Sequence, residues 1–299
     1  MSAANGAGPG PGFGTGGDWA ALLGVKGGPA IRPGSSMPSS VLLRLAGRTV
    51  LVDAGLGTAR AICDQGVPLT GIDLILITHL HSDHYLELGP LLHTAWTAGL
   101  TRPVRVVGPP GLSAYWEGFL ASMAFDIELR IADEGRVPLA PLAGIEVLEE
   151  GPVAAPEGLA ITARRNHHPP IEESYALRIE GAGRSVVLSG DTAPHEGWAG
   201  FCRGADLLIH EALLEAGVDA LVAGLAHPDP RLKAHILRSH TQAGEVGRIA
   251  AEAGVGALAL THLVPEGLPG CEPAAWEAEV RRHFAGPLHP GRDGMRIGL

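Results

Sequence analysis

The stretch Thr78-His-Leu-His-Ser-Asp-His84 gathers three imidazoles and one carboxylate within six residues. It follows Ile72 to Thr78, a short run of branched apolar residues that predicts a strand buried on both faces. Histidine and aspartate side chains clustered this densely are costly to bury unless they hold a metal ion. The first two histidines stand at alternate positions and can point the same way, while the Asp-His pair comes round to the other side. The motif therefore predicts two neighbouring metal sites where a strand passes into a loop.

The rest of the chain is predicted to form strands with helices dispersed among them. Residues 41–52 are typical of a β-hairpin. One helix is predicted from about Leu88 to Gly99, and a second at about 241–253 with Thr241 as its N-cap. Further strands are predicted at Val104–Val107, Ile145–Leu148, Leu159–Ala163, Tyr175–Ile179, Ser185–Leu188, Asp206–Ile209 and Ala257–Leu260. Sheets covered by helices, an α/β (α+β) fold, follow from this order.

Length and composition indicate a folded core behind a loose tail. Apolar residues make up 45% of the 299 residues, enough for one large domain or two small ones. Residues 1–17 are almost all small or polar, which predicts a disordered tail ahead of a folded domain at 18–299. No apolar run approaches the roughly 18 residues of a membrane span, and no secretion signal is visible. We expect a cytoplasmic protein without membrane contact.

The formal net charge of −10 is the opposite of the basic surface that binding along many phosphates requires. Long nucleic acid is therefore a disfavoured partner. A small anionic substrate is compatible with this charge if metal ions hold it, because a local dication outweighs the net charge. Lys26, Arg32 and Arg165 are candidates to neutralise such a substrate, although ordinary surface positions are the commoner role for basic residues.

The histidine motif resembles that of the metallo-β-lactamase fold superfamily. Members of that superfamily complete two metal sites with a later histidine, a bridging aspartate and a final histidine. The matches here are His168 in Asn166-His-His-Pro-Pro, Asp191 in Ser189-Gly-Asp-Thr and His262 in Leu260-Thr-His-Leu. His168 is preferred over its neighbour His167 because of the His-Pro-Pro sequence that follows.

The order and spacing resemble the ribonuclease Z and arylsulfatase-like branch in particular. The segments that carry this likeness include Val52–Gly55, Val107–Leu112, His210–Ala212 and Ser239–Thr241, and it covers roughly residues 20–299. The resemblance implies a four-layer αβ/βα metallo-β-lactamase sandwich with the metals at one edge between two sheets. Homodimers are usual among such relatives, which makes a homodimer an expectation by analogy.

The resemblance also implies a ligand set for two divalent ions. One ion would take His79, His81, His168 and Asp191, and the other Asp83, His84, Asp191 and His262. Imidazole and carboxylate ligands without cysteine suit Zn²⁺, and Mn²⁺ or Fe fits the same set. Two such ions would hold a bridging hydroxide and clamp the attacked oxyanion. Asp83 is expected to serve catalysis as well as ligation.

Further residues match positions beyond the ligands. His240 and Glu211 match a proton-donating pair of ribonuclease Z-like enzymes, which suits a poor alkoxide leaving group. The alternative is that Glu211 only orients a neighbour and that His240 lies ahead of a helix as a capping or surface group. Asp53 and His210 are expected to orient ligands or loops.

The long link at 212–238 between two site motifs is a candidate flap over the metals. His227 and His235, which this link carries, are the other histidines that would approach the site if the flap closes over the metals.

The leading hypothesis is a dinuclear metal-dependent hydrolase of a small phosphodiester or a related phosphoric or sulfuric ester. A lactonase or β-lactamase-type acyl hydrolase is one alternative, and a transfer-RNA 3′-processing endonuclease is another. In ribonuclease Z the latter activity depends on a protruding basic arm, whereas residues 109–163 hold nine acidic residues and two basic ones. A non-catalytic scaffold is the alternative from a different class.

Overall fold

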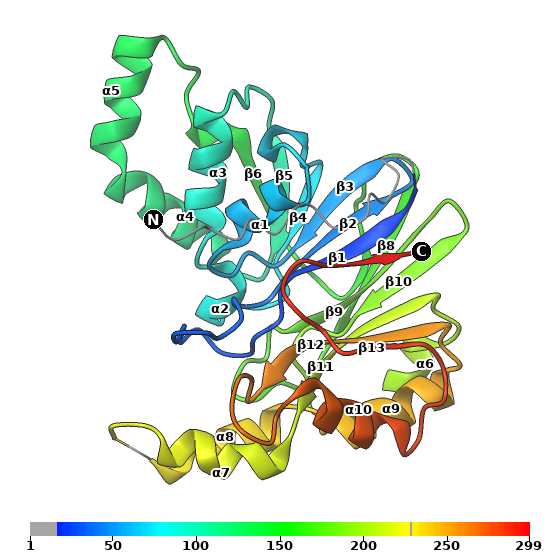
Figure 1. Ribbon diagram of the computed structural model, residues 1–299. Helices are drawn as coiled ribbons and strands as arrows, with labels where there is room; N and C mark the ends of the chain where they lie inside the picture. Colours follow the sequence, from blue (N-terminus) through cyan, green and yellow to red (C-terminus); the bar gives the residue numbers. More distant parts are fainter. Residues whose placement is uncertain (1–16, 228) are drawn as a thin grey trace, which may run out of the picture.

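The computed structural model describes residues 17–227 and 229–299, which fold into two β-sheets that face each other (Figure 1). The first sheet consists of β14 (Met295–Gly298), β1 (Trp19–Gly24), β2 (Ser40–Leu45), β3 (Arg48–Val52), β4 (Leu74–Leu76), β5 (Val104–Gly108) and β6 (Ala143–Val147), in that order. The second consists of β13 (Leu288–His289), β12 (Ala257–Val264), β11 (Leu207–Leu213), β10 (Arg184–Leu188), β9 (Tyr175–Gly181), β8 (Leu159–Arg165) and β7 (Gly151–Val153). The predicted tail lies, apart from Gly17, outside the described residues, so the domain boundary stays a prediction.

Helices cover the outer faces of both sheets (Figure 1). Beside the first sheet lie α1 (Thr58–Asp64), α2 (Ser82–Tyr85), α3 (Leu88–Thr97), α4 (Leu112–Ser122) and α5 (Ala124–Glu134), with single 3₁₀ turns at Leu69–Gly71 and Ala140–Leu142. Beside the second lie α6 (Trp198–Cys202), α7 (Glu215–Ala223), α8 (Pro230–Ser239), α9 (Ala243–Ala253) and α10 (Pro273–Arg281). The predicted four-layer αβ/βα sandwich is confirmed. No helix in the described part of the chain has the length and apolar character to cross a membrane.

Strands β1 to β4 of the first sheet are buried on both faces over almost their whole length, which explains their nearly unbroken apolar sequences. In β1, Ala20 and Leu22 point into the core between the sheets, while Ala21 and Leu23 pack under the outer helices. The same alternation recurs in β2, β3 and β4. Two apolar layers are thus fixed by a period of two along each strand.

Each sheet contains a parallel half. Strands β3 to β6 run parallel to one another, as do β10 to β13. The carboxyl ends of parallel strands meet at one edge of a sheet, where ligand sites collect in such folds. The chain therefore brings distant segments together at this edge.

Two details differ from the sequence prediction. The strand expected at Ile72 to Thr78 is only three residues long, because β4 pairs with β3 and β5 over Leu74–Leu76 alone. Thr241 is not the N-cap of α9, whose cap position is Gln242, because the Thr241 hydroxyl donates to Thr192 O instead. The latter bond ties the start of α9 to the loop after β10.

Candidate metal centre

The seven predicted ligands lie together at the edge of the sandwich, between the two sheets. His79, His81, Asp83 and His84 come from the loop after β4 and from α2, His168 follows β8, Asp191 follows β10, and His262 lies in β12. They converge because both parallel halves end at this edge. Six of the seven are buried and His81 is half-buried.

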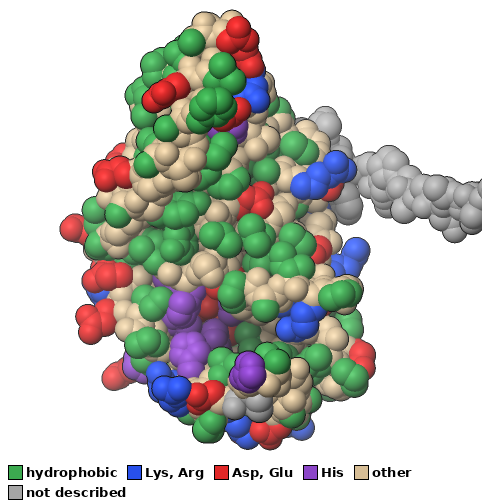
Figure 2. Space-filling model, turned by 90° about the vertical axis from the view of Figure 1, so that its left-hand side faces the viewer, with side chains coloured by type: hydrophobic (Ala, Val, Ile, Leu, Met, Phe, Trp, Pro, Cys, Tyr) green, Lys and Arg blue, Asp and Glu red, His purple; other side chains and the backbone are tan. Residues whose placement is uncertain are grey.

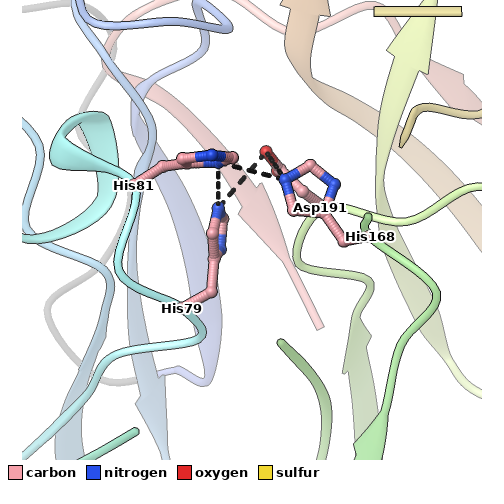
Figure 3. A group of neighbouring side chains, drawn as sticks. All are labelled: His79, His81, His168 and Asp191. Atoms are coloured by element: carbon pink, nitrogen blue, oxygen red, sulfur yellow. Dashed lines mark hydrogen bonds and ion pairs between the residues drawn. The ribbon is translucent and has the colours of Figure 1, made fainter. Parts of the chain in front are cut away.

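One group of four side chains is directed at a common point (Figure 3). His81 Nδ1 lies 3.1 Å from His79 Nε2 and 3.0 Å from His168 Nε2. Asp191 Oδ2 lies 3.6 Å from His79 Nε2 and 3.8 Å from His168 Nε2. Three nitrogens and one oxygen thus face one another at short range.

A second group shares Asp191 with the first. His262 Nε2 lies 3.1 Å from Asp191 Oδ2 and 3.3 Å from Asp83 Oδ2. His84 Nε2 lies 3.4 Å from Asp191 Oδ2 and 3.7 Å from Asp83 Oδ2. The same carboxylate oxygen therefore borders both groups, which is the position of a bridging ligand.

The spacing of these atoms fits metal coordination. Ligands about 2.0–2.1 Å from a tetrahedral zinc ion lie about 3.3–3.4 Å from one another, and the separations given above run from 3.0 to 3.8 Å. His84 Nε2 and Asp191 Oδ1 are buried with no hydrogen-bond partner among the residues that the structure describes. Buried polar atoms without a partner are unfavourable, so the residues present fit a pair of divalent ions.

Outer hydrogen bonds set which ring nitrogen of each histidine is free. Asp53 Oδ2 accepts from His84 Nδ1 at 2.8 Å, and Ser239 O accepts from His168 Nδ1 at 2.9 Å. The Thr78 hydroxyl donates to Asp53 and so accepts from His79 Nδ1 at 3.1 Å. In all three rings the proton on Nδ1 leaves the Nε2 lone pair for the centre, as a metal requires.

Burial and charge act in different ways on these groups. Burial, reinforced by His84, lowers the pKa of His79 well below its usual value, and burial lowers the pKa of His168 to about 4. Burial would also lower the pKa of His84, but the carboxylates of Asp191, Asp53 and Asp83 outweigh it and raise that pKa. A metal ion and a proton compete for such a nitrogen.

His262 owes its direction to a β-bulge. Strands β11 and β12 pair Glu211 with Thr261 and then Ala212 with Leu263, so His262 is the extra residue. Its φ of 41° lies in the left-handed region, which is uncommon for a residue with a side chain. Bulges of this kind re-aim a side chain beside a functional site, and here the ring turns to Asp83 and Asp191.

The predicted pair Glu211 and His240 is present, but only His240 reaches the cavity over the centre. Glu211 Oε1 accepts from His240 Nδ1 at 3.2 Å and from the backbone N–H groups of Thr192 and Thr241, both at 3.1 Å. Burial would lower the pKa of His240, but Glu211 outweighs it and raises that pKa to about 9. Glu211 therefore lies behind His240 and positions it.

A cavity of about 320 Å³ opens over the centre, and Figure 2 shows the histidines gathered in this hollow. Its lining includes Asp83, Asp191, His240 and His262. The predicted flap at 212–238 contributes α7 and α8, which form one wall with Leu221, Leu225, Leu232, Ile236 and His235. The sequence predicted a long link over 212–238, and the structure shows that it contains these two helices.

Other residues singled out in the sequence lie elsewhere. His167 and His227 are exposed, and neither lines the cavity. His210 does not orient a ligand, because its ring is held by Trp198 Nε1 at 2.9 Å and by Glu211 O. Arg165 pairs with Glu173 at 2.8 Å outside the cavity. Lys26 and Arg32 both line the cavity.

Comparison with known proteins agrees with this geometry. Over 279 residues the chain is 35% identical to a protein described as ribonuclease Z from Mycolicibacterium paratuberculosis, covering 92% of this chain and 96% of that protein. The chain belongs to the ribonuclease Z branch of the metallo-β-lactamase fold. The model of the family described as anti-Pycsar protein Apyc1 matches residues 22–258, so the chain is a member of that family also. It is a metal-dependent hydrolase of this fold.

Solved structures show the same fold. The metallo-β-lactamase fold protein YhfI from Bacillus subtilis has a TM-score of 0.68 and 23% identity, with 94% of this chain and 99% of that chain covered. Human tRNase Z, short form, has a TM-score of 0.66 and 21% identity, with 94% and 98% covered.

Proposed function

We propose that this hydrolase cleaves small phosphodiesters. Its two ions would be held by His79, His81, His168 and Asp191 and by Asp83, His84, Asp191 and His262. The observation that carries the proposal is the Asp191 oxygen that both groups share. The three histidine nitrogens of the first group lie on one side of it, and Nε2 of His84 and of His262 lies 3.1–3.4 Å away on the other. Two bound ions activate water and stabilise charge on the attacked group. Zn²⁺ suits these donors, and Mn²⁺ is compatible with them.

His240 supplies the proton that the leaving alkoxide needs. Its ring lines the cavity and offers an atom within 4.8 Å of ligand atoms of Asp191 and His262. Glu211 holds Nδ1, which leaves Nε2 as the nitrogen for a substrate. General acid catalysis of this kind is worth about 10²–10⁴ in rate. An acyl ester with a good leaving group gains much less from it.

The test is a substrate series with matched variants. Aryl phosphodiesters, aryl sulfates, lactones and β-lactams are assayed with Zn²⁺ and with Mn²⁺. We expect diester hydrolysis, lowered by about 10²–10⁴ in kcat in His240→Ala, with metal content unchanged. Glu211→Gln keeps an oxygen that accepts from His240, Thr192 and Thr241 but removes the negative charge that raises the pKa of His240. His240 should then lose its proton at lower pH, so the alkaline limb of the pH–rate profile should shift to lower pH. Turnover of acyl substrates alone would overturn the proposal.

The arginines in and after the protruding helix α5 favour a small substrate over a long nucleic acid, because carboxylates of the same segment pair with them. In Figure 1, α5 extends away from the first sheet. Arg130 lies 2.9 Å from both Asp126 and Glu134, and Arg136 pairs with Glu134 at 2.6 Å. Both arginines of residues 109–163 are thus engaged by carboxylates of their own segment and present no free charge to a phosphate backbone.

Processing of transfer-RNA 3′ ends is the second candidate, favoured by the ribonuclease Z relatives. A substrate of that size would contact many phosphates, and its affinity would fall steeply with salt. Cleavage of precursor RNA and of an aryl phosphodiester should therefore be compared between about 50 and about 200 mM salt, a range over which affinity for a long RNA falls by about tenfold or more. Tight, salt-dependent cleavage of precursor RNA would establish the second candidate and displace the first.

A further inference from the structure

Lys26 is a buried lysine in the wall of the cavity over the metal centre. It follows β1, and its exposed fraction is 2%. Nζ donates to Gly27 O at 2.9 Å and to Gly28 O at 2.8 Å. Both partners are neutral carbonyls, and no ion pair joins Lys26 to a carboxylate within residues 17–227 and 229–299. The ammonium is therefore buried without an opposite charge in contact.

Such a charge lacks the partner that buried charges usually have. An ammonium has three donors, of which the two carbonyls use two. Burial, together with Arg32, lowers the pKa of Lys26 against the opposing effect of Asp83 and Glu266. A buried cation without a paired anion is unfavourable in the free protein. An anion that enters the cavity would supply the missing partner.

The backbone fixes Lys26 relative to the metal centre. Gly28 N donates to Asp83 Oδ2 at 2.8 Å, with a φ of 82° at this glycine. A Cβ at Gly27 would lie 2.8 Å from His262 Cε1, so the loop packs directly against that ring. The Lys26 loop is thus attached to two residues of the second ligand group.

The part of the cavity lined by α7 and α8 has a different character. Its apolar side chains are Leu221, Leu225, Leu232 and Ile236, all from α7 and α8 or the turn between them. The volume of about 320 Å³ is at the lower end of small-molecule pockets. A ligand that fits both sides has an anionic centre and an apolar group.

We infer that Lys26 determines specificity by binding a non-bridging oxygen of the substrate's phosphoryl group. This rests on the proposed function. With that oxygen held at Lys26, the organic group of the ester faces the apolar side formed by α7 and α8. The substrate class is a phosphodiester that carries an apolar or aromatic group, and inorganic phosphate is its simplest probe.

The experiment uses the full chain loaded with Zn²⁺ and compares Lys26→Met, Lys26→Gln and the control Arg165→Gln. Arg165→Gln makes the same change in net charge outside the cavity. Inorganic phosphate is titrated calorimetrically, metal content is measured by elemental analysis, and Tm is recorded. We expect phosphate binding about 10- to 100-fold weaker in both Lys26 variants and unchanged in the control. The Tm of Lys26→Met should be equal or higher, because an apolar chain replaces a buried charge.

Two results would overturn the inference. One is unchanged phosphate affinity in both Lys26 variants with two metals bound. The other is normal phosphate affinity in Lys26→Gln with weakened affinity in Lys26→Met. Because the glutamine amide can still donate to the carbonyls of Gly27 and Gly28, this result would show that the hydrogen bonds hold the loop in place and that the charge of Lys26 does not bind phosphate. If Lys26→Met does not fold, Lys26→Gln decides. Failure of the proposed function is distinguishable, because it appears as absent diester turnover while phosphate binding still depends on Lys26.

Discussion

Asp53→Asn should weaken one metal site without unfolding the chain. Asp53 does not line the cavity over the centre. It lies behind His84 and joins that residue to Thr78. Oδ2 accepts from His84 Nδ1 at 2.8 Å, and Oδ1 accepts from Thr78 N at 2.8 Å. Both partners are N–H donors, so each carboxylate oxygen must accept. An amide has one oxygen, and its NH₂ group must then face one of the two donors.

The size of the effect follows from this mismatch. A buried donor left without an acceptor costs about 1–3 kcal/mol, so the free energy of unfolding of the metal-free protein should fall by about 2 kcal/mol. The partner of a metal-bound histidine contributes about 10- to 100-fold to metal affinity, which equals about 1.4–2.8 kcal/mol. The site that contains His84 should lose this affinity, whereas the site of His79, which Asp53 reaches only through the Thr78 hydroxyl, should lose less.

Urea unfolding of the metal-free protein and calorimetric titration with Zn²⁺ measure the two effects. Asp73→Asn is the matched control, because Asp73 Oδ2 also accepts a backbone N–H, from Thr49 at 2.8 Å, but Asp73 touches no predicted ligand. Its two metal affinities should equal those of the wild type. Equal affinities in Asp53→Asn would refute the reasoning, since the His84 tautomer would then not depend on Asp53.

Three further outcomes are expected. Gly27→Ala should weaken metal binding at least about tenfold, because its Cβ would lie 2.8 Å from His262 Cε1, whereas Gly200→Ala has free space and should not. Burial lowers the pKa of His210 to about 4, so the unfolded chain alone takes up this proton below about pH 6.5. Stability should therefore fall by about 3 kcal/mol from pH 6.5 to pH 4, and urea unfolding of His210→Gln should show a shallower fall. A chelator should lower Tm, which should recover with added Zn²⁺.

The first four ligands were predictable from the sequence because their signal is local, whereas His168, Asp191 and His262 were predicted from the resemblance to the metallo-β-lactamase superfamily. The cluster from His79 to His84 stands alone as a metal motif, and the later candidates each follow a strand-like run. Asp83 and His262 are separated by 179 positions, yet parallel strands bring their ends to one edge whatever the length of chain between them. Ligation itself awaits the measurements above.

Other features depend on tertiary contacts that leave no local pattern. Thr241 has the sequence of an N-cap, but its hydroxyl is taken by Thr192 O. Lys26 stands in a glycine-rich turn, where a lysine is usually exposed; its burial depends on packing against distant segments. The bulge at His262 arises from pairing with β11 and has no signal in β12 itself.

The acidic surface and the cavity act on substrates at different ranges. At physiological ionic strength, exposed charges are screened beyond about 8 Å, so a small ester inside the cavity would experience mainly the proposed ions and the cationic side chains that line it, Lys26, Arg32 and His240. A long RNA would extend over the outer surface, where a net charge of −10 disfavours many phosphates at once. This charge distribution is the physical reason for proposing a small anionic substrate over a long one. The proposal depends on where the cations lie, and the salt series with precursor RNA tests it against the activity of the ribonuclease Z relatives.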